Sequence, residues 1–311
     1  MDRGAHIHRC DFQVHTPRDP NWSGSVPVTV DERKTYARKF IAACRTKGLD
    51  AVAITDHHDM LFVPYIRQAA LEETHEDGSD LDPHERITVF PGMELTLGVP
   101  CQALLILDAD LPDDQLGVVL EALAITPVPD SEPQQPPVSV LSHTNLLSDV
   151  HKELDKREWL RGRYILLPHV TDKGHQTLMR SHMGPKYAEM PCVGGYVDGD
   201  FEAKTGEGNR KIFAGLDSNY GNRRIAVFQT SDSRAETFDD LGRHSTWVKW
   251  AEPTAEALRQ ACLAQESRIS LEPPPLPTTS LTKLRVSNSK FMGPIDLEFN
   301  AQYNAIIGGR G

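Results

Sequence analysis

A histidine or acidic residue follows directly on several short apolar runs, and this pattern most constrains how the chain can fold. The runs at 51–55 and 164–167, for example, lead to Asp56 and His169. Six such positions occur along the chain, held by Asp11 with Gln13 and His15, Asp56 with His57, Glu94, His143, His169 and Asp232. The carboxyl ends of parallel strands in an α/β fold lie on one face. The pattern therefore predicts that these side chains converge on one site.

Apolar periodicity predicts an alternating order of strands and helices. Strands are expected at 6–12, 51–55, 87–90, 103–107, 138–141, 164–167, 212–216 and 225–230. Helices are expected at 29–47, 64–73, 112–124, 146–160, from the strand at 164–167 to about 180, and at 255–264. A Pro-rich segment at 126–138 is expected to be an exposed loop or lid, and 194–211 a Gly-rich loop. The alternation indicates parallel strands, and hence an α/β barrel or a layered sheet.

The composition changes at 272–279, where EPPPLPTT reads as a linker. It separates a large unit at 1–271 from a short segment at 280–311. The short segment contains three runs that predict strands, LTKLRVSNSKF, IDLEFN and YNAIIGG. We therefore expect two units of unequal size.

Charge and cysteine usage exclude some classes of protein. A net charge of −11 argues against a uniformly basic nucleic-acid-binding surface. The window 151–186 is an exception at net +4, and suits either an anionic substrate or a solvated helix with paired charges.

Five dispersed cysteines without a C-x-x-C pair indicate reduced thiols in a cytoplasm. The sequence shows no apolar run of the ~20 residues that a membrane helix needs, and its start does not read as a signal peptide.

The convergent residues are metal ligands by type. Neutral imidazole and carboxylate groups suit zinc, manganese or iron, and one carboxylate can bridge two ions. A single histidine at a strand end is usually structural, but the joint occurrence at consecutive strand ends favours a metal site. His58, next to His57, stays undecided.

In this order the residues resemble the PHP (polymerase and histidinol phosphatase) family. The family pattern is D-x-H-x-H-T, then T-D-H, a glutamate after a strand, two spaced histidines and a closing S-D-x-H. The corresponding segments here are DFQVHT, Thr55-Asp56-His57, Glu94 in PGMELT, His143 in LSHTN, His169 in LPHV and Ser231-Asp232-Ser233-Arg234. The resemblance covers about residues 7–273.

The resemblance implies a distorted (β/α)7 barrel that holds two or three divalent ions, either Zn, Mn, Fe or Mg. One ion would be held by His15, Glu94 and Asp232, with Gln13 as a weak ligand or none. A second would be held by Glu94, His143 and His169, and a third by His57 with help from Asp19. Asp56 is expected to take part in catalysis.

Two positions depart from the family pattern, and both concern metal. Gln13 offers a carbonyl oxygen where the family has imidazole, which suits a harder ion. Arg234 stands where the family has its last histidine and is always charged, so it cannot bind a cation. Arg234 or Arg18 is expected instead to neutralise a substrate phosphate.

The last residues, AIIGGRG, resemble the beginning of a phosphate-binding P-loop after a strand. Gly308, Gly309 and Gly311 would be its glycines, and the chain stops before the P-loop lysine. With the strands before it, this segment resembles the start of an SMC/ABC-like ATPase head, and the whole chain resembles the N-terminal portion of a bacterial PHP–ATPase fusion protein. ATP and Mg would then bind only to the complete protein, and homo-oligomers would form through the ATPase heads.

The leading functional hypothesis is a metal-dependent phosphoesterase, nuclease-like, in which a metal-activated water cleaves DNA or RNA. Control by the ATPase in cis and a role in anti-phage defence follow by analogy of architecture. Two alternatives stay open: a phosphomonoesterase acting on small molecules, and a catalytically inert barrel that regulates the ATPase.

Overall fold

The computed structural model describes residues 4–98, 101–174, 176–180, 182–275, 281–290 and 293–299. Its main sheet has seven strands in the order β5-β4-β3-β2-β1-β8-β9. These strands are β1 (His6–Val14), β2 (Ala51–Ile54), β3 (Thr88–Leu97), β4 (Cys101–Leu107), β5 (Tyr164–Pro168), β8 (Thr246–Trp250) and β9 (Ile269–Ser270). The sheet is mixed, because β1, β2 and β3 are parallel whereas β4 and β8 run antiparallel to their neighbours.

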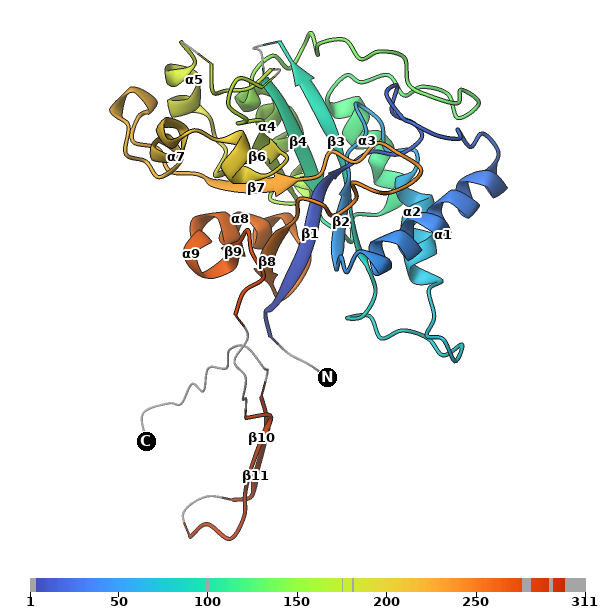
Figure 1. The fold of residues 1–311 in the computed structure, drawn as a ribbon, viewed down its shortest axis with the longest axis vertical. Helices are drawn as coiled ribbons and strands as arrows, with labels where there is room; N and C mark the ends of the chain where they lie inside the picture. Colours follow the sequence, from blue (N-terminus) through green and yellow to red (C-terminus); the bar gives the residue numbers. More distant parts are fainter. Residues whose placement is uncertain are drawn as a thin grey trace.

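A second sheet continues the curl of the first. It consists of the parallel strands β6 (Gly194–Asp198) and β7 (Ala226–Thr230). An isolated parallel bridge between His169 and Tyr196 joins the end of β5 to β6, and another between Val14 and Ser233 joins β1 to the end of β7. Strands β1 to β7 thus form an incomplete barrel (Figure 1).

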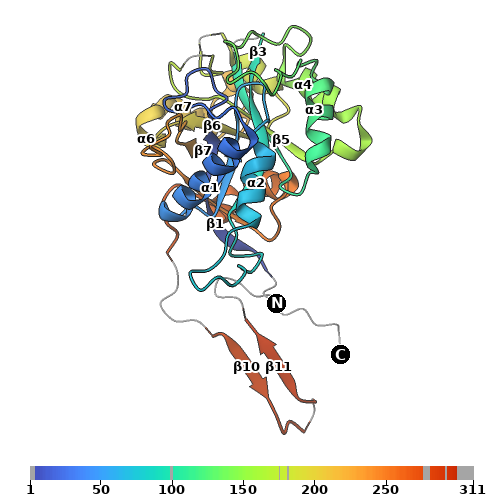
Figure 2. The ribbon, with the colours of Figure 1, turned by 90° about the vertical axis from the view of Figure 1, so that its right-hand side faces the viewer.

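Helices cover the outside of this barrel and one of its ends. The helices are α1 (Val30–Thr46), α2 (Val63–Leu71), α3 (Leu116–Ala122), α4 (Leu147–Asp155), α5 (Gly184–Glu189), α6 (Phe201–Lys204), α7 (Glu207–Phe213), α8 (Ala255–Leu263) and α9 (Gln265–Arg268). Helix α1 begins at a capping box, in which Thr29 Oγ1 accepts from the N–H of Glu32 and the Glu32 carboxylate accepts from the N–H of Thr29. Helices α1 and α2 lie side by side over the sheet (Figure 2). In the described part of the chain, no helix combines the length and the apolar character needed to cross a membrane.

The barrel interior is an apolar core closed from below by α8. Phe12 meets Phe90 and Phe228 edge to face, with ring centroids 5.9 and 5.4 Å apart. Trp250 lies against Phe90, and the described side chains of this layer are buried. Helix α8 packs against β5, β7 and β8 and is held in place by Asp108, whose carboxylate accepts from the N–H of Ala255. The floor of the barrel is therefore sealed by hydrocarbon.

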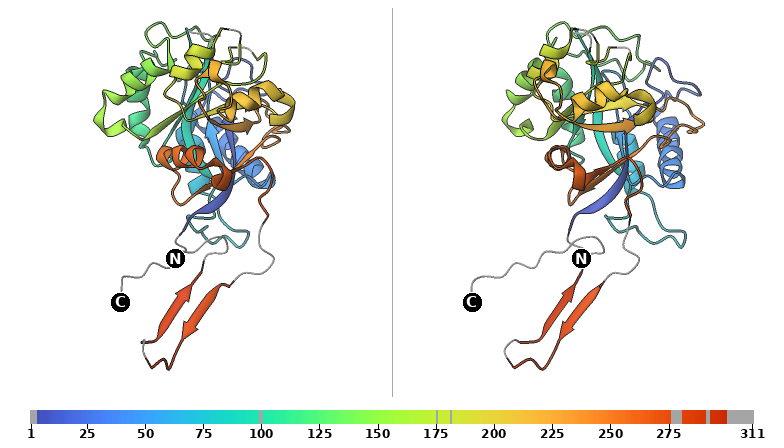
Figure 3. Two further views of the ribbon diagram at one scale, coloured as in Figure 1. Left: turned by 90° about the vertical axis from the view of Figure 1, so that its left-hand side faces the viewer. Right: turned by 60° about the vertical axis from the view of Figure 1, so that its left-hand side comes forward.

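Beyond the barrel the structure describes one antiparallel hairpin, β10 (Lys283–Val286) with β11 (Ile295–Glu298). It extends away from the barrel in every view (Figure 3). Two paired strands do not identify a fold. The assignment of 280–311 to an ATPase head stays a prediction, and Gly308, Gly309 and Gly311 lie outside the described residues.

Most predicted elements are confirmed, but four are wrong. Residues 138–141 form no strand, because only Leu141 makes a bridge, to Leu97. The described residues between β5 and 180, which are 169–174 and 176–180, are irregular and form no helix. The expected loop at 194–211 contains β6, α6 and most of α7. In place of the expected strand at 212–216, α7 ends at Phe213 and a turn follows. The expected parallel sheet is also corrected to a mixed one, since β4 reverses direction.

Candidate metal centre

The inward face of each barrel strand passes from apolar to polar residues towards the upper end. On β3 the inward Phe90 is followed four residues later by Glu94, and on β7 Phe228 is followed by Asp232 just beyond the strand. Because side chains alternate between the two faces of a strand, residues two and four apart share a face. The same rule brings His57 above Ala53, His169 above Leu167 and Asp198 above Tyr196.

Strand β1 reaches the same site through an irregularity. The pairing with β2 shifts between Asp11 and Val14, as at a β-bulge. Gln13, within the irregular stretch, and His15, just beyond it, both contact Glu94, although Phe12 already faces the interior. Bulges are common next to active sites because they re-aim side chains. This one adds an inward-facing polar residue to β1.

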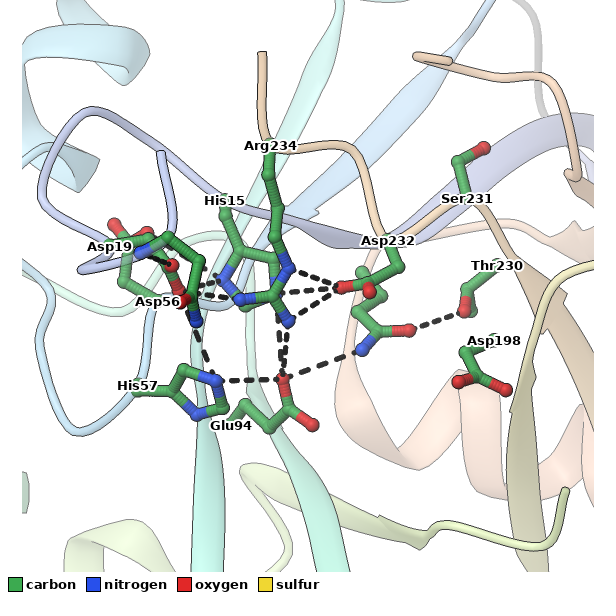
Figure 4. A network of polar contacts seen from close by, with 12 residues as sticks. His15, Asp19, Asp56, His57, Glu94, Asp198, Thr230, Ser231, Asp232 and Arg234 are labelled. Carbon is green, nitrogen blue, oxygen red and sulfur yellow. Dashed lines mark hydrogen bonds and ion pairs between the residues drawn. The ribbon is translucent and has the colours of Figure 1, made fainter. Parts of the chain in front are cut away.

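His15 lies at the middle of the polar cluster (Figure 4). Its Nδ1 is 3.0 Å from Asp19 Oδ2, and its Nε2 is 3.1 Å from Asp232 Oδ1 and 3.4 Å from Glu94 Oε2. Burial lowers the pKa of His15, but these three carboxylates outweigh burial and raise the pKa well above its ordinary value. The imidazole is thus surrounded by negative charge.

Glu94 is buried and contacts more of the cluster than any other carboxylate described. Its Oε2 faces Gln13 Nε2 at 3.4 Å and His57 Nε2 at 3.7 Å, and its Oε1 accepts a 2.9 Å hydrogen bond from the Tyr196 hydroxyl. Burial raises the pKa of Glu94, but the histidines and arginine beside it hold that pKa well below its ordinary range. A carboxylate in this place would be available to a divalent ion bound beside His15.

Two of the predicted residues have their polar atoms occupied by the protein. Thr230 Oγ1 donates to Gln13 Oε1 at 2.6 Å. The side-chain carbonyl of Gln13, which was expected to contact metal, is therefore already hydrogen-bonded, and the NH₂ group of Gln13 faces Glu94. Asp56 accepts from the N–H and the hydroxyl of Thr16, at 2.7 and 2.6 Å. Burial raises the pKa of Asp56 to about 7. Both residues are placed to position their neighbours.

The two arginines differ from what the sequence suggested. The guanidinium of Arg18 is fully buried and binds Asp59 and the carbonyls of Val128, Pro129 and Glu132 in the Pro-rich segment. It therefore ties 126–138 to the site, with its donors bonded within the protein, and its contact with a substrate phosphate stays a prediction. The guanidinium of Arg234 lies inside the cluster and pairs with carboxylates.

The two histidines predicted to hold the second ion lie in different surroundings, one exposed and one buried. His143 is exposed in an irregular segment, because the strand expected to carry it does not form. His169 is buried, stacks on Tyr196 with ring centroids 5.0 Å apart, and has Nε2 3.4 Å from Asp198 Oδ1. Asp198 was missed because β6 was read as loop. Its signal was the short run YVD, an apolar pair followed by a carboxylate.

Asp232 and His58 complete the surroundings. Asp232 has a φ of +50°, in the left-handed region that costs energy for a residue with a side chain. Such strain is typical of functional positions. His58 accepts from the N–H of Thr96 through Nε2 at 3.0 Å, and burial lowers its pKa to about 4. His58 therefore has a structural role, joining the end of β2 to β3.

The donor set fits a divalent ion. His15, Glu94 and Asp232 offer ligand atoms that all lie within 4.8 Å of one another, as do His15, Asp19 and Asp56. The ring nitrogens of His15 and the Nδ1 of His57 are buried without a hydrogen bond of normal geometry, although carboxylates lie close to the His15 nitrogens. Imidazole with carboxylate oxygen is the ligand chemistry of zinc, manganese and iron.

A cavity of about 270 Å³ lies beside this cluster, with His57 in its wall. The amide side chains of Asn21, Gln102 and Gln176 line it as well. The basic window 151–186 is partly neutralised, because Lys156 pairs with Glu153.

Comparison with known proteins finds similarity in structure. No protein-family model matches the sequence, and no curated protein sequence matches it. A lesion-specific endonuclease from Pyrococcus furiosus matches with a TM-score of 0.53 and 15% identity, over 85% of this chain and 57% of that one. Endonuclease Q in complex with a 27-mer duplex carrying an abasic lesion at the active site matches with a TM-score of 0.50 and 12% identity, over 86% and 58%.

These two similarities establish a shared fold. A two-domain protein from Bacteroides vulgatus that contains a predicted PHP-like metal-dependent phosphoesterase is more distant, with a TM-score of 0.44, 16% identity and coverage of 86% and 66%. The present chain spans about 57% of the length of the Pyrococcus endonuclease. The comparisons do not support the expected fusion to an SMC-like ATPase.

Proposed function

We propose that the chain is a metal-dependent phosphoesterase that hydrolyses phosphodiester bonds in nucleic acid. The observation that carries the proposal is the buried cluster of His15, Glu94 and Asp232 at the upper end of the barrel. A divalent ion bound there would supply a water of lowered pKa and positive charge for the phosphoryl oxygens. The described residues near the cluster include no cysteine or serine paired with a histidine as a nucleophile, which agrees with attack by water.

The protein's own residues would hold and orient this chemistry. His15 and Asp232 would bind on one side, and Glu94 would share its carboxylate between that position and the His169–Asp198 side. Gln13 and Tyr196 fix the Glu94 carboxylate from two directions, at 3.4 and 2.9 Å. The amides of the neighbouring cavity would bind the substrate by hydrogen bonds.

Nucleic acid is favoured over a small phosphomonoester by the fold shared with two structures of Endonuclease Q, one of them in complex with a duplex substrate. This support is by analogy of fold. Control by an ATPase and a role in defence rest on the sequence resemblance alone.

Elemental analysis and hydrolysis assays test the proposal together. We expect the purified chain to hold transition-metal ions and to cleave a generic phosphodiester and DNA or RNA with added Mn²⁺. Glu94→Gln, which keeps the size of the side chain, should lose bound metal and about a thousandfold or more of the activity. The exposed Glu121 provides the matched control, since Glu121→Gln should change neither.

Each other outcome has a clear meaning. Full activity in Glu94→Gln would refute the assignment of the site. Cleavage of a phosphomonoester without cleavage of any phosphodiester would favour the small-molecule alternative. Absence of metal and of activity with every added ion would favour the inert barrel.

A further inference from the structure

The side chain of Arg234 enters the metal-binding cluster instead of facing an approaching substrate. Its Nη1 donates to Asp19 Oδ2 at 2.9 Å, and its Nη2 and Nε donate to Asp232 Oδ1 at 2.8 and 3.0 Å. Nη2 is also 3.7 Å from Glu94 Oε2. One guanidinium thus faces three carboxylates (Figure 4).

The same oxygen atoms face the two histidines of the cluster. Asp19 Oδ2 is 3.0 Å from His15 Nδ1 and 3.9 Å from His57 Nε2, and Glu94 Oε2 is 3.7 Å from His57 Nε2. An ion held between Asp19, His57 and Glu94 would need the oxygens that Arg234 already contacts. The guanidinium and such an ion therefore compete for one position. Arg234 also bonds Asp232 Oδ1, so an ion beside His15 would have to use the other oxygen of Asp232.

The backbone holds Arg234 in this place. Ser23 donates its N–H to the carbonyl of Arg234 at 2.8 Å, and His15 donates its N–H to the carbonyl of Ser233 at 3.0 Å. These bonds fasten both sides of the segment that bears the arginine. Guanidinium keeps its charge at any pH in which the protein is folded. Arg234 is thus a permanent, tethered cation in the cluster.

Counting charges shows what this cation does. Asp19, Glu94, Asp232 and Asp198 contribute four negative charges, of which Arg234 balances one. With neutral histidines, two divalent ions, one hydroxide and one phosphodiester then leave a single negative charge. A third divalent ion would turn this into an excess of one positive charge in a buried site, which is costly.

We propose that the guanidinium of Arg234 takes the place of one divalent ion, so that the cluster holds at most two ions. The proposal rests on the proposed function, because it presumes that the cluster binds metal. Arg234 acts here as a fixed positive charge that positions the carboxylates. Replacing it by a neutral side chain opens the position between Asp19 and His57 to a further ion.

The test counts bound ions directly, by elemental analysis after equilibration with Mn²⁺ or Zn²⁺ and removal of excess ion. Arg234→His removes the charge and adds a ligand, and Arg234→Gln only removes the charge. Both should bind about one more ion per chain than the unaltered protein. Arg234→Lys keeps the charge and should bind the same number. Arg243→His, the same change at an exposed arginine paired with Asp240, is the matched control.

The outcomes separate this inference from the proposed function. Three ions in the unaltered protein would overturn the inference without any variant, so poor folding of a variant leaves it testable. Equal ion counts in the unaltered protein and in folded Arg234→His and Arg234→Gln would overturn it too, while leaving the phosphoesterase intact. Absence of ions from all of these proteins would refute the proposed function itself, and the inference with it.

Discussion

Tyr196 connects two of the candidate ligands, and replacing it by phenylalanine isolates the contribution of one hydroxyl. The hydroxyl donates to Glu94 Oε1 at 2.9 Å, while the ring stacks on His169. Tyr196→Phe keeps the ring and its stacking and removes the hydrogen bond. The Glu94 carboxylate can then rotate, so part of the free energy of metal binding is spent on orienting it.

The size of the effect follows from the kind of bond. A hydrogen bond to a charged group contributes about 1.5–3 kcal/mol. At about 1.4 kcal/mol for each factor of ten, this predicts metal binding weaker by about 10- to 100-fold. Partners that orient metal ligands elsewhere show losses of about 10- to 100-fold when they are mutated.

Titration with Mn²⁺, followed by the EPR signal of free ion, measures this affinity. Tyr187→Phe is the matched control, because it also removes a buried hydroxyl, one that donates to the carbonyl of Arg223 at 3.3 Å. We expect the control to bind metal as the unaltered protein does. Equal affinity in Tyr196→Phe and Tyr187→Phe would refute the claim that Glu94 needs this hydroxyl for its orientation.

Three further predictions concern the protein around the site. Arg18→Met should lower the free energy of unfolding by about 3–5 kcal/mol, since it leaves the buried Asp59 carboxylate without its positively charged partner. It should also expose 126–138 to limited proteolysis. His58→Ala should cost about 1–3 kcal/mol in the same measurement, because it removes the acceptor of the Thr96 N–H, and should leave metal content unchanged. Burial lowers the pKa of His8 to about 4, so the unfolded chain binds more protons between about pH 6.5 and 4 and stability falls as the pH drops through that range. His8→Phe should reduce this loss.

Each of these predictions has a result that would contradict it, and the first also has a control variant. Arg38 is exposed on α1, and Arg38→Met should shift stability by about 0.5 kcal/mol or less. Cleavage within 126–138 at equal rates in Arg18→Met and Arg38→Met would contradict the anchoring role. Loss of bound metal in His58→Ala would mean that His58 is a ligand. An unchanged difference in unfolding free energy between pH 7 and pH 5 in His8→Phe would show that another group titrates.

The sequence predicted the convergence of strand ends because the signal was local. The runs before His57, Glu94, His169 and Asp232 are short and apolar. Each polar residue comes two or four residues after an inward-facing apolar one, so it lies on the same face of the strand. The capped helix α1 was equally plain, with Thr29 at its start. Period and capping depend on neighbours in sequence, and such features need no knowledge of the fold.

Features that depend on distant neighbours were missed. Strand β6 begins Gly194-Gly195, which reads as loop, yet a Cβ at Gly194 would lie 2.8 Å from Cys262 Sγ, and one at Gly195 would lie 2.9 Å from the carbonyl of Pro168. Glycine occupies both positions because the Cys262 side chain and the Pro168 backbone approach too closely to leave room for a Cβ. Missing this strand meant missing Asp198.

The role of Arg234 could be stated only in part. Its charge ruled it out as a ligand, but its partners are the carboxylates of three different segments, and only the closed fold brings these together. At His143 the error was the opposite one, because a strand was predicted from a valine-rich run and does not form. Pro136 and Pro137 precede that run, and no neighbouring strand offers it a ladder in the described structure.

The sealed floor of the barrel has a kinetic consequence. The layer of Phe12, Phe90 and Phe228 with α8 beneath it leaves the cluster no exit on that side. Access to the cluster is then from the side where the cavity lined by His57 lies. If substrate and product both use that side, a product that keeps a terminal phosphate would compete with the next substrate for entry.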